Sequence, residues 1–512
     1  MRHLSHHPDK VLSKKLLQYL DEGVPILYDG PTYNRVCPNW KSVNVFRDAV
    51  KKTLVEDVKL GRKSGPFLYP PVANFIGSPL GAFEKKRTGK IRVIHDLSWP
   101  PHVSVNSHID PLLCSVSYVS IDNAVKALRL RGRHSLMSKI DLKDAYKNIM
   151  VRPADWHHLG STWVNDDGET EFFVDHVLPF GLRSSAMLFD LFASALEFAM
   201  YLNKCTNVIH YLDDFYTCGK AETEECSSNL SIMLKTCVLL GMPVNPAKVV
   251  QPVSRMEFLG IIIDSDVMEL QMSQERIDDV FETLRLWSTD HSGSKRSLLS
   301  LLGKLVFLCR IVKPGRIFVR RIFDLSKSVK CLHHHVRLTK EAAADVQWWL
   351  SFCMQWNHRS VFYDDEWSSG SFLQLSTDAS DVGIGGVFVH RWYSRELSVS
   401  ESSMSIAYRE LLAVVSACAC WGSLLSGRRV MLECDNSSVV FCVNNGTSKS
   451  SHVMSLIRQL FYLAARYQFD LRLIHVPGKD NVAADLLSRL RVSEFAEGFP
   501  GSDVIGAVVP VL

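Results

Sequence analysis

The sequence lacks the features that mark several classes of protein. None of its 13 cysteines forms a Cys-x-x-Cys pair, which argues against a zinc site and favours reduced thiols in an intracellular protein. A run of about 18 apolar residues, long enough to span a membrane, is absent. The first residues carry no signal-peptide pattern. We therefore expect no membrane partner and a location in the cytoplasm or the nucleus.

The sequence also has little excess charge. Its 58 lysines and arginines nearly balance its 54 aspartates and glutamates, which leaves a formal net charge of +4. A polyanionic partner would therefore have to be bound by local basic segments. The length predicts several domains, and the hydrophobic content of 46% is ordinary for a globular protein. The cluster of Cys331 with three histidines lacks further ligands at suitable spacing and does not indicate a metal site.

The most informative feature that is present is a pair of adjacent carboxylates, Asp213 and Asp214. They follow an apolar stretch and precede Phe215 and Tyr216, a pattern that is typical of the tip of a β-hairpin. Most Asp-Asp pairs are solvated turn residues. At a strand end, however, two like charges persist mainly when a cation neutralises them. The pair is therefore a candidate metal site.

A third carboxylate, Asp141, lies upstream. It ends an apolar segment and is followed by a turn towards a helix. If Asp141 lies beside the hairpin, the three carboxylates could hold two Mg²⁺ ions for in-line phosphoryl transfer. Catalysis at such a site consists mostly of positioning and charge neutralisation.

Five segments, in this order, resemble the catalytic motifs of reverse transcriptases. They are residues 138–146, Leu178-Pro179-Phe180-Gly181-Leu182-Arg183-Ser184-Ser185, Tyr211-Leu212-Asp213-Asp214, Asn245-Pro246-Ala247-Lys248 and Phe258-Leu259-Gly260. Within that family the chain is similar to LTR-type or DIRS-like retrotransposon enzymes, with gypsy-like polymerase and ribonuclease motifs. Ser78-Pro79-Leu80-Gly81 and residues 155–160 favour the DIRS-like group.

The resemblance implies an α+β multidomain protein, a right-hand polymerase with fingers, palm and thumb or connection. It implies that Asp141, Asp213 and Asp214 are the metal ligands. Tyr146 matches the aromatic gate that excludes a 2′-hydroxyl, although an ordinary core aromatic is the alternative. Asp144 matches a residue beside the pocket for the primer 3′-hydroxyl.

Further residues match contacts to nucleotide and template. The basic segment from Lys85 to Arg92 reads as a hairpin with a polar tip, and the two end residues match triphosphate-binding positions. Phe180 stands where retroviral enzymes carry a glutamine. Gly181 would let the backbone approach the template-primer closely. Lys248 is either an acid for the departing pyrophosphate or simply an exposed lysine.

A second set of carboxylates follows in the order strand, helix, strand, helix. This order resembles the RNase H fold, an α/β domain whose four carboxylates bind two Mg²⁺ ions and cleave RNA in an RNA-DNA hybrid. The matching residues are Asp378, Glu410, Asp435 and Asp485. His475 and Asp480 are rivals for the fourth position, but the Ala-Asp-Leu-Leu-Ser-Arg setting favours Asp485.

These motifs predict the domain organisation. An N-terminal leader, residues 1–70, contains two helices and precedes the fingers and palm, residues 71–265. Residues 266–369 form thumb and connection helices, residues 370–491 the RNase H-like domain and residues 492–512 a tail. We expect helices over residues 185–202, over 273–288 with Ser273 as the N-cap, and over 296–312.

The resemblance implies an RNA-directed and DNA-directed DNA polymerase with RNase H activity. Its partners would be an RNA template, a DNA primer, deoxynucleoside triphosphates and an RNA-DNA hybrid. Its cofactor would be Mg²⁺, two ions per active site, for which Mn²⁺ can substitute. The alternative is a catalytically inactive or host-adopted relative that only binds nucleic acid; the presence of all seven carboxylates favours the enzyme.

Overall fold

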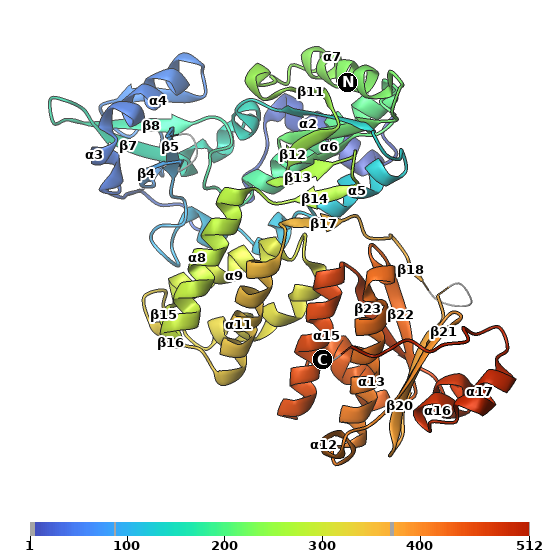
Figure 1. The fold of residues 1–512 in the computed structure, drawn as a ribbon. Coiled ribbons are helices and arrows are strands. Elements are labelled where there is room, and N and C mark those ends of the chain that lie inside the picture. Colours follow the sequence, from blue (N-terminus) through green and yellow to red (C-terminus); the bar gives the residue numbers. More distant parts are fainter. Residues whose placement is uncertain (1–5, 86–88, 369–372, 511–512) are drawn as a thin grey trace. The chain divides into compact units, whose positions relative to one another are not determined.

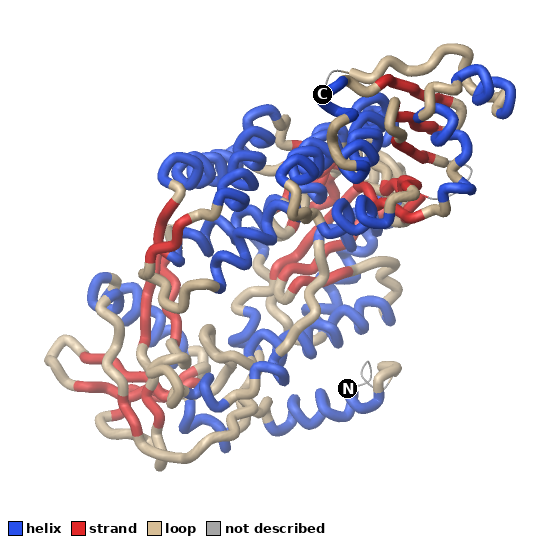
Figure 2. The backbone as a smooth tube through the Cα atoms, turned by 90° about the horizontal axis from the view of Figure 1, so that it is seen from below, coloured by secondary structure: helices blue, strands red, loops and turns tan. Residues whose placement is uncertain are grey.

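A computed structural model describes residues 6–85, 89–368 and 373–510. The chain forms two compact units, Met1–Ser254 and Arg255–Leu512. Figure 1 shows the elements of both units, and Figure 2 distinguishes their helices from their strands.

The first unit contains a four-stranded antiparallel sheet in the order β11-β6-β10-β9. Its strands are β6 (Leu136–Asp141), β9 (Ile209–Tyr211), β10 (Asp214–Gly219) and β11 (Val250–Val253). Helices α6 (Ser185–Leu202) and α7 (Glu225–Leu239) pack against this sheet (Figure 1). The shared core buries Ile140, Phe215 and Leu188 completely. This sheet is the palm that the motif order predicts, and α6 has the bounds expected for the helix after the second motif.

A second sheet of the first unit forms the fingers, in the order β1-β3-β7-β8-β2. Its strands are β1 (Arg35–Val36), β2 (Lys63–Phe67), β3 (Ile76–Gly77), β7 (Gly160–Val164) and β8 (Thr170–Asp175). A separate hairpin joins β4 (Leu80–Glu84) to β5 (Ile91–His95). The hairpin predicted from the basic segment is therefore present, but Lys86, Arg87 and Thr88 at its tip lie outside the described residues.

The segment expected to be a separate leader is part of this unit. Asp9 caps α2 (Lys10–Glu22), and a break at Phe46 divides the second expected helix into α3 (Ser42–Val45) and α4 (Arg47–Lys59). The apolar faces of these segments are buried. Val24 and Ile26 belong to the palm core, and Val50 and Leu54 pack with Trp163 of the fingers. A boundary at residue 70 therefore has no counterpart in the packing.

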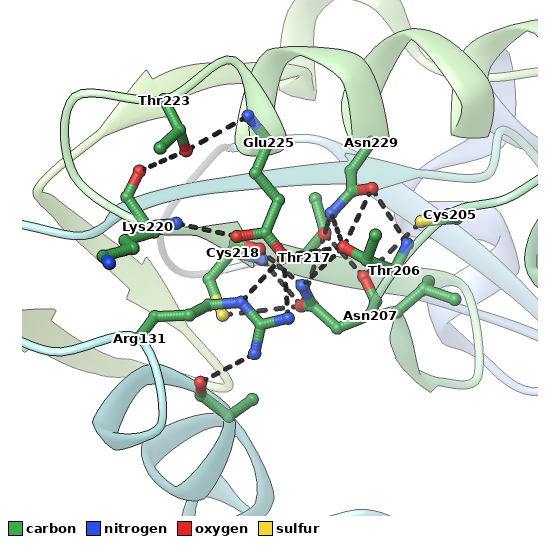
Figure 3. Close-up of polar contacts among 12 residues, drawn as sticks. Arg131, Cys205, Thr206, Asn207, Thr217, Cys218, Lys220, Thr223, Glu225 and Asn229 are labelled. Atoms are coloured by element: carbon green, nitrogen blue, oxygen red, sulfur yellow. Dashed lines mark hydrogen bonds and ion pairs between the residues drawn. The ribbon is translucent and has the colours of Figure 1, made fainter.

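A buried polar network fixes the end of β10 that lies farthest from Asp214 (Figure 3). The Thr217 hydroxyl donates to the Asn207 carbonyl at 2.6 Å and accepts from the Asn229 amide at 3.0 Å. Arg131 and Glu225 form an ion pair of 2.9 Å beside it. Because these buried groups are hydrogen-bonded, they order β10 and α7 relative to each other without a large desolvation penalty.

The second unit begins with a four-stranded sheet in the order β12-β13-β14-β17. Its strands are β12 (Arg255–Phe258), β13 (Ile261–Asp264), β14 (Glu269–Gln271) and β17 (Arg359–Val361). The helices that follow are α8 (Gln274–Asp290), α9 (Lys295–Leu308), α10 (Arg320–Lys327) and α11 (Lys340–Gln355). The division therefore falls before β12, eleven residues earlier than the expected palm boundary at 265, because β12 pairs with β13 and not with the palm sheet.

Two helix predictions in this region agree with the structure at their starts. Ser273 is the N-cap residue of α8, as expected, in extended conformation. The second helix was expected to continue to Val312, but α9 ends at Leu308 and a 3₁₀ segment, η6 (Lys313–Val319), follows. Pro314 lies in the first turn of η6, where a helix tolerates proline, and thus begins a new segment instead of continuing α9.

The RNase H-like part is a sheet in the order β18-β22-β19-β20-β21, with β23 paired to β22. The strands are β18 (Trp367–Ser368), β19 (Leu375–Ala379), β20 (Gly383–Phe388), β21 (Arg391–Glu396), β22 (Arg429–Cys434) and β23 (Asp470–His475). Helices α13 (Ile406–Trp421) and α15 (Ser451–Tyr467) pack on each other, and α13 also packs on β19 and β20. The order of strands and helices matches the predicted α/β domain.

The segment predicted to be an unassigned tail packs on this domain. Its helix α17 (Val492–Gly498) buries Phe495 against Val387 and Leu487. Farther on, the backbone of Ala507 donates to the Trp392 carbonyl at 2.7 Å. The chain to at least Ala507 therefore belongs to the domain.

Two helices pass a test for membrane spans that considers length and composition only. They are α6 and residues 406–425, which include α13. Both pack in the cores described above, α6 on the palm sheet and α13 beneath β19. Core helices commonly meet this test, so the finding is weak support for a span.

Candidate active sites

The first site is built on the β9-β10 hairpin. Tyr211 and Asp214 are cross-strand partners, so Leu212 and Asp213 form a two-residue loop. Leu212 has a φ of 54°, as one position of such a tight loop requires. Asp214 is in turn the register partner of Asp141, the last residue of β6. The structure thus brings the three predicted carboxylates to one end of the palm sheet.

The electrostatics of this cluster indicate a need for cations. The pKa of Asp214 is raised to about 6, chiefly by burial; the charges of Asp213 and Asp141 contribute to the rise, and Lys139 opposes it. Burial also raises the pKa of Asp213. The ammonium of Lys248 lies 2.6 Å from Asp141 and supplies one positive charge. Carboxylate oxygens grouped in this way are the ligands that Mg²⁺ prefers, so these residues fit the predicted metal pair.

Basic and aromatic side chains continue from the carboxylates towards the fingers. The Arg92 guanidinium lies 4.6 Å from the ring centroid of Phe180, a cation–π contact. Lys85 interacts electrostatically with Arg92: burial, the charge of Arg92 and the charge of Lys248 all lower the pKa of Lys85. Phe180, which replaces a glutamine of retroviral enzymes, therefore provides an apolar platform for the arginine.

Tyr146 also contacts Phe180. Its ring centroid is 5.0 Å from that of Phe180 and 5.5 Å from that of Phe189. Burial raises the pKa of its hydroxyl to about 12. Tyr146 packs on the palm core while remaining partly exposed. This position suits a gate and a core aromatic alike.

Two further predicted residues have partners that the sequence did not reveal. Asp144, in left-handed conformation, accepts a hydrogen bond of 3.0 Å from Arg62. Gly181 has a φ of 116°, and a Cβ there would lie only 1.9 Å from the backbone oxygen of His95. The structure therefore shows a close approach that requires glycine, and it is to the chain's own β5. The expected approach to template-primer stays a prediction.

The second site lies at the carboxyl ends of two neighbouring parallel strands. Asp378 is in β19, and Asp435 follows the end of β22; Thr377 and Cys434 are register partners. Glu410 projects from α13, and Asp485 lies on α16 (Val482–Ser488). Helix α16 can approach because β20 is glycine-rich: a Cβ at Gly385 would lie 2.5 Å from the backbone nitrogen of Ser488.

These four carboxylates interact strongly. Burial raises the pKa of Asp378 to about 6, against a hydrogen bond from Ser488, and the charges of Asp435 and Asp485 add to the shift. Burial, Asp378 and Asp435 together raise the pKa of Glu410 to about 9. The Ser488 hydroxyl donates to Asp378 at 2.5 Å.

The rivals for the fourth position occupy different places. Asp480 is exposed, in the short 3₁₀ segment before α16. His475 contacts the Asp435 backbone oxygen at 3.1 Å and lies beside the site. Asp485 is the one of the three whose charge acts on Asp378. Its position therefore favours it, as the sequence did.

Sequence reasoning missed three residues of these sites. His210, in β9, contacts Glu197 and lies 3.4 Å from Asp190, both on α6. Ser488 and Cys434 border the second cluster. The positions of Ser488 and Cys434, three residues after one predicted ligand and directly before another, were an available signal.

Comparisons with known proteins identify both domains. Residues 84–263 match the family "Reverse transcriptase (RNA-dependent DNA polymerase)" and residues 369–465 match "RNase H-like domain found in reverse transcriptase". The transposon Tf2-3 and Tf2-4 polyproteins of Schizosaccharomyces pombe are each 23% identical over 456 residues. The match covers 85% of this chain and 30% of each polyprotein, so the chain spans less than a third of their length.

A solved structure supports the fold. The foamy viral protease-reverse transcriptase dRH, solved in complex with ds DNA, matches with a TM-score of 0.51 at 16% identity. The match covers 93% of this chain and 81% of that one. The motifs, the two carboxylate sites and the family matches lead to one conclusion: the chain belongs to the reverse transcriptases with RNase H domains found in LTR-type retrotransposons.

Proposed function

We propose that the chain copies RNA and DNA templates into DNA and cleaves the RNA strand of RNA-DNA hybrids, each by two-metal phosphoryl transfer. The observation that carries this proposal is the presence of two separate carboxylate clusters, each with pKa values raised by burial and mutual repulsion. Such clusters are stabilised by divalent cations. The relation to DIRS-like elements in particular stays a prediction.

At the first site, Asp141, Asp213 and Asp214 would hold two Mg²⁺ ions. The ions supply charge neutralisation and activation of the attacking hydroxyl when bound. Arg92 and Lys85 bind the triphosphate, Arg92 with a guanidinium oriented by Phe180. Tyr146 lies under the sugar and excludes the 2′-hydroxyl. Lys248, already beside Asp141, neutralises charge on the departing pyrophosphate.

The substrates follow from these groups. A deoxynucleoside triphosphate suits a site with paired cations and an aromatic gate, and a DNA primer on an RNA or DNA template suits the palm. The fold match to a foamy viral enzyme solved with ds DNA supports a duplex partner. Phosphate contacts would make binding of the duplex weaker as salt concentration rises.

At the second site, Asp378, Glu410, Asp435 and Asp485 would hold two Mg²⁺ ions against the RNA strand of a hybrid. Ser488 orients the Asp378 carboxylate through its hydroxyl. Glu410 is held at the floor of the site by α13, where burial keeps water away from it. Each site has its own ligands, so the two activities should be chemically independent.

Two substitutions test this proposal. Asp213→Asn should reduce primer extension on RNA by about 10²- to 10³-fold while RNA cleavage and template binding persist, because only charge neutralisation in the transition state is lost. Asp435→Asn should abolish hybrid cleavage and spare extension. Both are measured on labelled substrates with Mg²⁺, and template affinity is measured by filter binding.

The design also separates the alternative, a chain that only binds nucleic acid. A parent protein that binds duplex but neither extends nor cleaves would establish that alternative. Loss of both activities from either single substitution, in a folded protein, would contradict the two-site assignment.

A further inference from the structure

The second carboxylate cluster contains a sulfur atom. Cys434 is the last residue of β22, is fully buried and directly precedes Asp435. One ligand atom each from Glu410, Cys434 and Asp435 lie within 4.8 Å of one another. Among the residues that the structure describes, this is the one group of three such ligands at that spacing.

One residue of this group also has an unsatisfied oxygen. Glu410 is 3% exposed, and its Oε2 atom has no hydrogen-bond partner within the described ranges. An unpaired buried carboxylate oxygen is costly, so its presence points to a cation that is bound there in the working protein. The thiol of Cys434 is close enough to Glu410 and Asp435 to provide a third ligand to such a cation.

A thiolate changes which cations such a site prefers. Mg²⁺ takes oxygen ligands, whereas sulfur ligands select softer ions such as Zn²⁺. Tetrahedral Zn²⁺ bonds of about 2.0–2.3 Å place ligand atoms roughly 3.3–3.5 Å apart. The group, whose ligand atoms lie within 4.8 Å of one another, therefore needs to contract by about 1.5 Å at most. Two carboxylates and one thiolate leave a fourth position open for water or phosphate oxygen.

We propose that Glu410, Cys434 and Asp435 form a mixed oxygen–sulfur site that binds a thiophilic divalent cation, such as Zn²⁺ or Cd²⁺, in competition with Mg²⁺. Binding displaces the Cys434 thiol proton to the buffer. The ion occupies ligands of the ribonuclease site, so it inhibits hybrid cleavage. The inhibition of hybrid cleavage rests on the proposed function, whereas the binding of the cation does not.

The polymerase site offers a contrast within the same chain. No cysteine sulfur is grouped with Asp141, Asp213 or Asp214 in the described part of the chain, and Lys248 neutralises Asp141 there. A thiophilic ion should therefore discriminate between the two activities. The cluster around Cys331 and His333, which is exposed, forms no such group either.

The binding test uses Cd²⁺ alone, followed by the charge-transfer absorption of its bond to thiolate. Because Cys331 is exposed, the parent for this test carries Cys331→Ser. We expect one equivalent of Cd²⁺ to give the absorption in this parent and in Cys442→Ser, a partly buried cysteine of the same domain outside the group. Cys434→Ser should lose the absorption and weaken Cd²⁺ binding by at least about tenfold.

A second variant covers the case in which Cys434→Ser does not fold. Glu410→Gln keeps the thiol and should retain the absorption, but with an affinity at least about tenfold weaker. Undiminished Cd²⁺ absorption in a folded Cys434→Ser, or unchanged affinity in Glu410→Gln, would overturn the proposal.

Activity assays distinguish this inference from the proposed function. With Mg²⁺ in excess, Zn²⁺ should inhibit hybrid cleavage at concentrations that leave primer extension intact, and Cys434→Ser should raise the inhibitory concentration by at least about tenfold. Cleavage with Mg²⁺ that is equally sensitive to Zn²⁺ in both proteins would refute the sulfur ligand and leave the ribonuclease assignment standing. If the parent bound Cd²⁺ at Cys434 but did not cleave the hybrid, the ribonuclease assignment would be refuted and the sulfur ligand would stand.

Discussion

The two carboxylate sites are made of similar ligands but differ in how the protein balances their charge. In the polymerase site, Lys248 forms an ion pair with Asp141, and Lys139 and Arg92 oppose the raised pKa values of the neighbouring aspartates. In the second site, Arg489 forms an ion pair with Asp485 and opposes the raised pKa of Asp378, and Arg409 opposes that of Glu410. Within the described ranges, however, no ion pair links Asp378, Glu410 or Asp435 to a lysine or arginine. The pKa of Glu410 rises to about 9 as a result of burial and two like charges.

This difference suits the two reactions. A polymerase site must receive a triphosphate, an anion, so basic side chains near the carboxylates serve the substrate as well as the ligands. A ribonuclease site receives one backbone phosphate and relies on the ions. The second site should therefore depend more on its metals, both for activity and for stability.

The largest expected effect concerns the aromatic residues of the polymerase site, Tyr146, Phe180 and Phe189. Tyr146→Val should lower the preference for deoxynucleotides over ribonucleotides by about 10²-fold, because the ring that meets a 2′-hydroxyl is removed. Single-nucleotide incorporation with both sugars measures the ratio. Tyr146→Phe, which keeps the ring, is the control and should keep the preference; an unchanged ratio in Tyr146→Val would assign Tyr146 to the core alone.

The next effect concerns His210 in the polymerase hairpin, which contacts the acidic residues Asp190 and Glu197 of α6. Hydrogen bonds to Asp190 and Glu197 outweigh burial and raise the pKa of His210 from 6.5 to about 9. The protonated form therefore stabilises the fold fully below about pH 6.5, and this contribution disappears as the pH rises through about 9. His210→Gln should cost about 2–3 kcal/mol near pH 6 and little above pH 9.5.

Calorimetric unfolding of the full chain across this pH range, without metal, measures the effect. His176→Gln is a matched control in the same unit, because burial lowers the pKa of His176. A destabilisation by His210→Gln that does not change with pH would show that the imidazole packs there without carrying charge.

A smaller effect tests the metal dependence of the second site. Because the pKa of Glu410 is raised from 4.5 to about 9, the metal-free fold loses stability as the pH rises across that interval. Glu410→Gln removes this cost and should stabilise the metal-free chain by roughly 2 kcal/mol at pH 8. Mg²⁺ should stabilise the parent more than the variant.

Thermal unfolding in EDTA and in Mg²⁺ provides the comparison. The control is Glu401→Gln in the same domain. Arg395 and the Ser398 backbone hold the pKa of Glu401 below its usual range, so this variant should lose stability instead. If both variants changed stability in the same direction, the proposed difference between Glu401, which is paired with Arg395, and the unpaired Glu410 would be wrong.

The sequence predicted both sites because each ligand is marked locally. Asp141 and Asp435 end apolar strands, Asp213 and Asp214 lie in a hairpin pattern, and strand pairing then brings these ends together. The order of elements predicted the palm and the RNase H-like domain for the same reason. These features depend on a few neighbouring residues and on general rules of sheet topology.

What the sequence did not reveal depends on contacts between distant residues. The contacts of His210 join strand β9 to helix α6, whose acidic residues look like ordinary surface charges in the sequence. Gly181 is required by the carbonyl of His95, which no local pattern indicates. Residues 1–70 carry no catalytic motif, so their apolar positions could not be assigned to the palm and fingers cores before the fold was known.

The smallest effect concerns Lys248, the lysine that distinguishes the polymerase cluster. Its side chain is 57% exposed, so the ion pair with Asp141 is screened by water and contributes about 1 kcal/mol or less. Lys248→Met removes a cation that competes with the metals, and the Mg²⁺ concentration for half-maximal extension should fall by up to about fivefold. Maximal extension should also slow if the ammonium neutralises the leaving pyrophosphate. Lys235→Met, an exposed lysine on α7, should change neither quantity. A rise in the required Mg²⁺ would mean that Lys248 supports the ligands and does not compete with the ions, and the contrast between the two sites would then lie in burial alone.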